Sequence, residues 1–411
     1  MAMKMTNTNK RFTIKAFDQT GDRPLELSRP GNMKSHPWSY MELPFDPEYE
    51  LYNNRMTPAS LNNITPDEQY WAVRTDVILR NTGEFPVEIS GEDAFKFANY
   101  IFTRDINKIK PGRCSYQFAC YHDGGMITDG VMLHFFDKLW MAQADGDLFN
   151  WYLAHAKDFD VKISDPNVWV SQIQGPKSLD LLEAVIDGDL QKPFNYFDFC
   201  TVLIDGEEVI ISRTGFSNEL GWEIYLQPEN DFKKIGDRIW EAGKKFNLKL
   251  TGSPVFRARR IEAGLLSAGR DFNNFTTPFD VGLNRFVNMQ KGNFVGKQAL
   301  QRALQRKTIN HRVMGLRVKD GIASLGSKIM HNKQCIGEVT SSSWSPYQEC
   351  GVAIVRLNNN FTDTDSQVEV YNYKNDKLNA HICDLPMYDK NAEIVRGIDR
   401  KVPKTSNPWF K

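Results

Sequence analysis

Residues 116–136, YQFACYHDGGMITDGVMLHFF, contain two largely apolar runs on either side of a His-Asp-Gly-Gly turn. This arrangement is typical of two antiparallel strands joined in a hairpin. The run that follows, KLWMAQA (138–144), predicts a third strand, and DLFNWYLAHAKDF (147–159) predicts a helix. The unit is therefore a local antiparallel sheet with a helix attached.

Similar units lie on both sides of this stretch. Upstream, PVEISG (86–91) predicts a strand and EDAFKFANYIF (92–102) a helix with acidic residues in its first turn. Downstream, the predicted elements are a strand at 168–174, a helix at 176–186, a hairpin at 202–216 around Asp205-Gly206, a strand at 221–226 and a helix at 230–246. Strands and helices mixed with many antiparallel hairpins indicate an α+β fold and not a doubly wound parallel sheet.

The chain beyond about residue 310 has almost no helical periodicity. Short strand-like runs separated by turns predict a small β-barrel or sandwich there. These runs are HRVMGLRVK (311–319), SKIMH (327–331), QCIGEVTSSSW (334–344), CGVAIVRL (350–357), SQVEVYNY (366–373) and LNAHICDL (378–385).

The composition excludes several classes of protein. The 411 residues carry 51 Lys and Arg against 51 Asp and Glu, and 41% of them are hydrophobic. A balanced charge gives no support for a nucleic-acid surface or a polybasic membrane patch. The apolar runs are far shorter than the roughly 20 residues that span a bilayer, and the polar start lacks the apolar stretch of a signal peptide. We therefore expect a soluble cytoplasmic protein.

Common catalytic and metal motifs are missing from the sequence. The six cysteines form no CxxC pair, the seven histidines lack the short spacings of metal ligands, and neither GxGxxG after a strand, GxxxxGK[ST], HExxH nor GxSxG occurs. We therefore expect no metal site and no disulfide framework. Generic motifs go no further than a multi-domain α+β protein.

Several separate blocks, in order along residues 50–387, resemble the glycine-cleavage T-protein (aminomethyltransferase) family of tetrahydrofolate enzymes. The blocks are VEISGEDA (87–94), TRD (103–105), GRCSY (112–116), GGMITDGVM (124–132), IQGPKS (173–178), SRTGFSNELGWEIYL (212–226), RIEAGLLSAGRDF (260–272), TTPFDVGL (276–283) and FVGKQAL (294–300). Within this family the chain is most similar to the dimethylsulfoniopropionate demethylases, through YNNRMTPASL (52–61), SSSWSPYQECGVAI (341–354) and CDLP (383–386).

The resemblance implies a division of the chain into four parts. Residues 1–45, rich in proline, are expected to form an irregular arm on the surface. Residues 46–305 would form the folate-binding region, with two subdomains and a ferredoxin-like segment, and residues 306–387 the C-terminal barrel. Residues 388–411 would form a tail.

The resemblance also implies folate-binding residues. A buried Glu223 would accept two N–H groups of the pterin ring, with Tyr225 beside it on the same strand face. Asp129 would lie beside the folate N5 nitrogen, where a carboxylate stabilises the positive charge that methyl transfer creates. Tyr116 and Arg260 match further family positions near the cofactor.

Three positions depart from the family and bear on the substrate. Phe216 stands in the cofactor region where relatives carry Tyr or Trp, and NEL (218–220) replaces the usual Gly-Glu-Asp. Arg80 stands where most relatives carry aspartate. An arginine repels a bare cation and attracts a carboxylate, which leaves a zwitterion or an aromatic acid as the substrate. Tyr52 and Trp222 are the aromatic residues predicted to hold a cationic methyl donor.

The implied function is transfer of a methyl group from a small donor, dimethylsulfoniopropionate first, to N5 of tetrahydrofolate. Three alternatives stay open: aminomethyl transfer as in glycine cleavage, O-demethylation of a methoxylated aromatic acid, and folate binding without catalysis. The expected partners are the donor and tetrahydrofolate. Neither nucleic acid nor membrane is expected, and a homodimer is left open.

Overall fold

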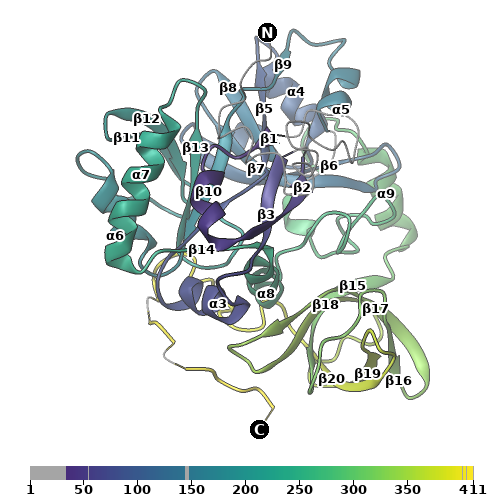
Figure 1. Cartoon of the computed structure of the whole chain (residues 1–411). Coiled ribbons are helices and arrows are strands. Elements are labelled where there is room, and N and C mark those ends of the chain that lie inside the picture. Colours follow the sequence, from purple (N-terminus) through teal and green to yellow (C-terminus); the bar gives the residue numbers. More distant parts are fainter. Residues whose placement is uncertain (1–33, 54, 144–147, 400, 404, 411) are drawn as a thin grey trace, which may run out of the picture.

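The computed structural model describes residues 34–53, 55–143, 148–399, 401–403 and 405–410. Figure 1 shows a large body built from two sheets and their helices, with the closed barrel below and to one side of it. This confirms the α+β fold and the C-terminal barrel expected from the sequence.

A six-stranded sheet forms one half of the body. In spatial order its strands are β11 (Phe199–Ile204), β12 (Glu207–Ser212), β13 (Gly221–Leu226), β10 (Trp169–Gln174), β4 (Ile78–Asn81) and β14 (Lys249–Leu250). Helices α6 (Ser178–Val185) and α7 (Phe232–Gly243) cover its outer face, where Ile224 and Leu226 pack against Ile235 and Ile239. A 3-10 turn, η4 (Lys244–Phe246), extends α7.

A five-stranded sheet forms the other half, and all its strands lie between β4 and β10 in the chain. In spatial order they are β6 (Arg113–Cys120), β7 (Met126–His134), β8 (Lys138–Gln143), β5 (Phe85–Ser90) and β9 (Lys162–Ser164). Helices α4 (Ala94–Ile101) and α5 (Leu148–His155) cover its outer face, and η3 (Ile106–Lys108) follows α4. The predicted hairpin is thus confirmed as β6–β7.

The first described residues are part of the core. After β1 (Lys34–Ser35) come α2 (Ser39–Glu42) and η2 (Leu43–Phe45), and the Trp38 side chain is fully buried with its indole nitrogen 2.6 Å from the Phe232 carbonyl oxygen. The expectation of a surface arm is therefore wrong for this part, because Trp38 fills the space left by the missing side chain of Gly236 on α7. The rest of the predicted arm, residues 1–33, lies outside the described residues.

Short elements connect this segment to the six-stranded sheet. Strands β2 (Pro47–Tyr52) and β3 (Arg55–Leu61) complete a three-stranded sheet with β1. Helix α3 (Pro66–Thr75) follows and leads directly into β4. The Thr65 hydroxyl accepts a hydrogen bond from the Glu68 backbone while the Glu68 carboxylate accepts one from Thr65, which satisfies two amides at the start of α3.

The connection to the barrel contains two helices, α8 (Ser253–Ala263) and α9 (Lys297–Arg306), with η5 (Asn284–Phe286) between them. Ile261 of α8 and Leu300 of α9 share a hydrophobic cluster with Phe118 of β6 and Ile354 of the barrel. The body and the barrel are therefore joined through a common apolar core.

The barrel closes through six antiparallel strands, and all six runs predicted from the sequence are found. In spatial order they are β15 (His311–Val318), β18 (Cys350–Asn358), β17 (Gln334–Ser345), β16 (Lys328–His331), β19 (Gln367–Tyr371) and β20 (Lys377–Cys383). Leu316, Val355 and Ile382 are among the residues that fill its interior. The tail beyond it packs back on the protein, where Trp409 lies 5.1 Å from the His381 ring.

Replacement of Trp38 by alanine tests whether the N-terminal segment is part of the core. We expect Trp38→Ala to lower the free energy of unfolding by about 3–5 kcal/mol, as for other buried aromatic residues. Phe136→Ala is the control, since Phe136 is 88% exposed, and should change stability by less than about 0.5 kcal/mol. Equal effects of the two variants in urea denaturation would contradict the core position of Trp38.

Candidate functional site

The inner faces of the two sheets pack against each other. Leu133 of β7 and Trp140 of β8 share one hydrophobic cluster with Ile210 of β12 and Tyr225 of β13. Because alternate residues of a strand point to the same face, Glu223 lies on this inner face with Tyr225, and Asp129 lies on it with Leu133. The two predicted carboxylates thus come from sheets that face each other.

A row of polar residues crosses four strands of the six-stranded sheet. Glu223 is directly opposite Ser212 on one side and Gln172 on the other, and Gln172 is directly opposite Arg80. Ser212, Gln172 and Glu223 are all buried. The register of the sheet therefore places Arg80 on the same face as Glu223, although the two are far apart in the chain.

The Glu223 carboxylate is held by three hydrogen bonds. It accepts from the Gln172 amide at 3.0 Å, the Thr214 hydroxyl at 2.5 Å and the Tyr225 hydroxyl at 3.1 Å. Burial, and to a smaller extent the charge of Glu84, raise the pKa of Glu223 to about 7. The side-chain oxygen of Gln172 is buried with no hydrogen-bond partner among the described residues. Glu223 and Gln172 together offer acceptors to a ligand that carries N–H groups.

Asp129 is held by Tyr116 on the neighbouring strand. The Tyr116 hydroxyl donates to the Asp129 carboxylate at 2.7 Å, and Asp129 is 6% exposed. Burial raises the pKa of Asp129 to about 6, while the Tyr116 hydrogen bond lowers it. The structure therefore brings Tyr116 and Asp129 together as the sequence predicts. The carboxyl can exist in either protonation state near neutral pH.

Arg260 is buried beside Asp129 in an ion pair of its own. Its guanidinium lies 2.8 Å from Asp271 and donates to the Ser341 hydroxyl of the barrel at 2.7 Å. The charge of Asp271 raises the pKa of Asp129 and the charge of Arg260 lowers it. In this structure Arg260 joins α8 to the barrel and acts on Asp129 through its charge.

The residues predicted to bind the substrate, and Phe216 of the predicted cofactor site, lie in different places. Arg80 is half-buried on the inner face, and its charge interacts with Tyr52. Phe216 packs between α3 and α8, in the loop between β12 and β13. Trp222 is 1% exposed on the outer face with its ring 5.1 Å from Phe194, because it alternates with Glu223 along β13. We therefore leave Trp222 out of the proposed site.

Three polar residues around these carboxylates were not predicted from the sequence: Gln172, Asp271 and Glu84. Gln172 had a signal, since it is a polar residue within the apolar strand VWVSQIQ. Asp271 lies in the block RIEAGLLSAGRDF that contains Arg260, but its pairing with Arg260 depends on a tertiary turn. Glu84 precedes the strand PVEISG and had no local signal.

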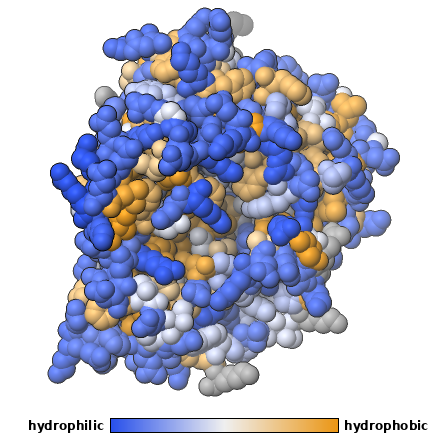
Figure 2. Space-filling model, turned by 180° about the vertical axis from the view of Figure 1, so that it is seen from behind, coloured by the Kyte–Doolittle hydropathy of each residue, from blue (hydrophilic) through white to orange (hydrophobic). Residues whose placement is uncertain are grey.

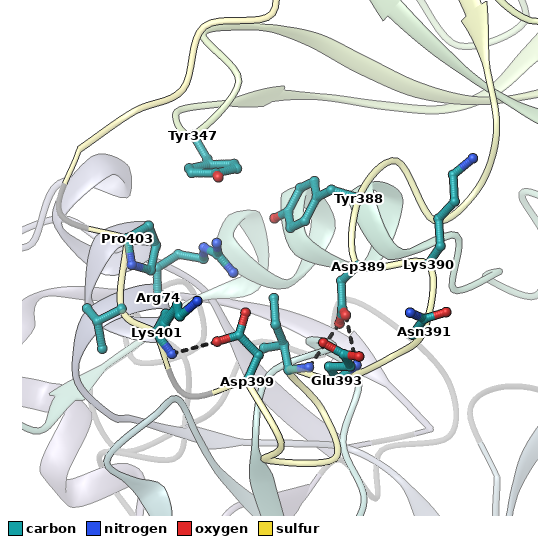
Figure 3. A pocket seen from close by; sticks show the side chains of 12 residues that line it. Arg74, Tyr347, Tyr388, Asp389, Lys390, Asn391, Glu393, Asp399, Lys401 and Pro403 are labelled. Atoms are coloured by element: carbon teal, nitrogen blue, oxygen red, sulfur yellow. Dashed lines mark hydrogen bonds between the residues drawn. The ribbon is translucent and has the colours of Figure 1, made fainter.

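A separate pocket of about 390 Å³ lies between α3, the barrel and the tail (Figure 3). Arg74 projects into it beneath Tyr347 and Tyr388, with its guanidinium carbon 4.9 and 5.4 Å from their ring centres. The Arg74 guanidinium is bonded to the buried carboxylate of Glu219. None of the site residues predicted from the sequence lines this pocket.

The face opposite to the view of Figure 1 is hollowed near its middle, where hydrophobic and hydrophilic residues meet (Figure 2). The described residues contain no group of three or more His, Cys, Asp or Glu side chains that could hold a metal ion. In the same part of the chain no helix is long and apolar enough to cross a membrane.

Comparison with known proteins identifies the family. Residues 35–291 match the family described as the GCVT N-terminal domain, and residues 311–389 match the glycine cleavage T-protein C-terminal barrel domain. The aminomethyltransferase of Caldanaerobacter subterraneus subsp. tengcongensis is 33% identical over 315 residues, covering 74% of this chain and 82% of the relative. That of Thermoanaerobacter sp. (strain X514) is 30% identical over 360 residues, covering 84% and 96%.

A solved structure agrees with this assignment at the level of the fold. The glycine cleavage system aminomethyltransferase T from Bartonella henselae has a TM-score of 0.77 and 20% sequence identity, over 87% of this chain and 99% of that one. The chain belongs to the glycine cleavage T-protein family, whose members are enzymes that transfer one-carbon units with tetrahydrofolate. The demethylase branch within the family stays a prediction.

The raised pKa of Glu223 makes stability depend on pH. Burial favours the protonated carboxyl in the folded protein, so the unfolding free energy falls as the pH rises from about 4.5, its ordinary pKa, through about 7. Glu223→Gln removes this effect. Relative to wild type, the variant should therefore gain on the order of 2–3 kcal/mol between the two ends of this range.

Urea denaturation at several pH values measures this gain, and Glu229→Gln is the matched control because Glu229 is exposed. The stability of the control relative to wild type should not change with pH. A constant difference between Glu223→Gln and wild type across the range would show that Glu223 titrates normally.

Proposed function

We propose that this protein transfers a methyl group from a small onium compound, dimethylsulfoniopropionate first, to N5 of tetrahydrofolate. The observation that carries the proposal is the position of Glu223 and Asp129 on facing inner surfaces, each buried and each with a raised pKa. The sequence blocks similar to the demethylases, such as YNNRMTPASL, support the methyl donor.

Glu223 would anchor the pterin. A carboxylate accepts two adjacent N–H groups in a bidentate, charge-assisted pair, and Gln172 beside it has a buried oxygen that can accept another hydrogen bond. Because the pKa of Glu223 is about 7 in the protein alone, donors on the pterin would favour the ionised form. The residues present therefore fit this part of tetrahydrofolate.

Asp129 would act on the charge that the reaction creates. Tetrahydrofolate supplies a nucleophilic nitrogen at N5, and the methyl carbon moves to it while the carbon–sulfur electron pair leaves on a neutral thioether. An ionised Asp129 near N5 would stabilise the positive charge and accept the N5 proton, which suits a carboxyl with a pKa of about 6. The Tyr116 hydroxyl fixes the orientation of this carboxylate.

Two substitutions separate these roles. Glu223→Gln should weaken tetrahydrofolate binding about 10- to 100-fold, because it removes a charge-assisted pair worth roughly 1.5–3 kcal/mol. Asp129→Asn should leave binding within a few-fold of wild type and lower kcat about 10²- to 10³-fold. Calorimetry and single-turnover assays measure the two quantities. Wild-type folate affinity in Glu223→Gln would place the pterin elsewhere.

Aminomethyl transfer is the second candidate. The relatives that are 30–33% identical carry the name aminomethyltransferase, and the proposed folate residues would serve that reaction equally. Its one-carbon unit is an aminomethyl group carried on a lipoyl protein, so activity would depend on that carrier.

A panel of donors tests the choice between the candidates. The enzyme would be incubated anaerobically with tetrahydrofolate and, separately, dimethylsulfoniopropionate, glycine betaine, dimethylglycine or vanillate. We expect 5-methyl-tetrahydrofolate, detected by mass spectrometry, with the sulfonium compound. Formation of 5-methyl-tetrahydrofolate with another donor alone would keep methyl transfer and identify that donor as the substrate. Methylene-tetrahydrofolate and ammonia formed only with an aminomethyl-lipoyl carrier would replace the proposal by the second candidate.

A further inference from the structure

The segment Thr82–Glu84 connects β4 of one sheet to β5 of the other, and it ends in a carboxylate that is not fully paired. Glu84 Oε2 is buried and has no hydrogen-bond partner among the described residues. The segment itself is held firmly: the Asn53 amide donates to the Gly83 carbonyl at 3.1 Å, and Arg55 donates to the Glu84 carbonyl at 2.9 Å. Glu84 is thus a fixed acceptor at the junction of the sheets.

Arg80, on the adjoining strand β4, is a cation that has no carboxylate partner at ion-pair distance among the described residues. Its guanidinium donates to the Ser253 hydroxyl at 2.9 Å, approaches the Pro58 carbonyl at 3.5 Å and lies 5.1 Å from the centre of the Phe256 ring. Within the described part of the chain, no carboxylate oxygen lies within 4.0 Å of it. Arg80 therefore keeps donor capacity for an anionic group.

The Glu84 carboxylate and the Arg80 guanidinium interact electrostatically but do not form an ion pair. Burial lowers the pKa of Arg80, while the negative charges of Glu50 and Glu84 raise it. Burial raises the pKa of Glu84, while the positive charge of Arg80 lowers it, so each group lies in the field of the other. The charge of Glu84 is also felt by Glu223, whose pKa burial raises first and Glu84 second. Within the described residues neither group has an oppositely charged partner at ion-pair distance. Charges that are partly removed from water without such a partner are costly, and a ligand carrying both opposite charges would satisfy both.

Tyr52 adds an aromatic ring at the same place. A Cβ atom on Gly83 would lie 2.4 Å from Tyr52 Cδ1. The Tyr52 ring therefore occupies the space that a side chain at position 83 would take. The Tyr52 hydroxyl is also in electrostatic contact with Arg80. A carboxylate beside an aromatic face is a favourable environment for an onium cation.

We propose that Glu84, Tyr52 and Arg80 form a two-charge subsite for a zwitterionic donor, with its onium group at Glu84 and Tyr52 and its carboxylate at Arg80. The subsite names the donor class of the proposed function and rests on it. It also explains why an arginine can stand in this region of an enzyme whose donor is cationic, since Arg80 serves the carboxylate end of that donor.

Three probes separate the two charges. Dimethylsulfoniopropionate carries both, its methyl ester carries only the sulfonium, and 3-(methylthio)propionate carries only the carboxylate. Calorimetry without tetrahydrofolate measures binding with no turnover. Wild type should bind the zwitterion at least 10-fold more tightly than either single-charge probe. Binding of none of the three, or equal binding of all three, would overturn the subsite.

Two variants assign the charges to residues. Glu84→Gln should weaken binding of the zwitterion and of the ester about 10-fold or more and leave binding of the thioether acid unchanged. Arg80→Gln should weaken binding of the zwitterion and of the thioether acid and leave binding of the ester unchanged. Loss of all three probes in either variant, or of none, would contradict the assignment. Glu229→Gln and Arg312→Gln are matched controls on exposed residues and should bind as wild type.

Failure of the subsite and failure of the proposed function are distinguishable. The two-charge pattern without 5-methyl-tetrahydrofolate from any donor would retain the subsite and reject methyl transfer. Methyl transfer from dimethylsulfoniopropionate that is unaffected by Glu84→Gln and Arg80→Gln would retain the function and reject the subsite. Thermal unfolding of each variant confirms that it is folded before binding is measured.

Discussion

The packing of two sheets face to face is the constraint on which the candidate site depends. Glu223 and Asp129 lie on inner faces whose other side chains are largely apolar, so their carboxyl groups are removed from water. Removal from water favours the neutral carboxyl and raises both pKa values toward neutrality. The hydrogen bonds from Thr214 and Tyr116 offset part of that cost and fix the two carboxyl groups in place.

A second group of buried polar residues joins the body to the barrel. Arg259 of α8 is bonded to Glu219 and to Glu262, and Glu262 accepts from Tyr70 of α3 and Ser345 of the barrel. Buried ion pairs of this kind define the relative orientation of elements more than they add to stability. Helix α8 also carries Arg260, which donates to Ser341 of the barrel and pairs with Asp271. Contact with the barrel therefore fixes the positions of the two charges that act on Asp129.

The sequence predicted the elements well and the contacts between them unevenly. The hairpin 116–136 and the six barrel strands could be predicted because their signal is local alternation and turn chemistry. Tyr116 and Asp129, which the resemblance places near the cofactor, lie on one hairpin, so their contact depends only on local strand register. Glu84 and Gln172 could not be assigned, because their environment depends on which strands become neighbours. Trp38 was misjudged because proline-rich flanks hide a core residue whose partner, Gly236, is about 200 positions away.

The order of the strands also has a consequence for synthesis of the chain. All strands of the five-stranded sheet lie between residues 85 and 164, whereas the six-stranded sheet needs β4 before that segment and β14 after it. On the ribosome, the five-stranded sheet can pair completely while β4 still waits for β10. The apolar face of the five-stranded sheet stays uncovered until β10, β12 and β13, which end at Leu226, have left the exit tunnel, and β14 joins the edge of β4 last.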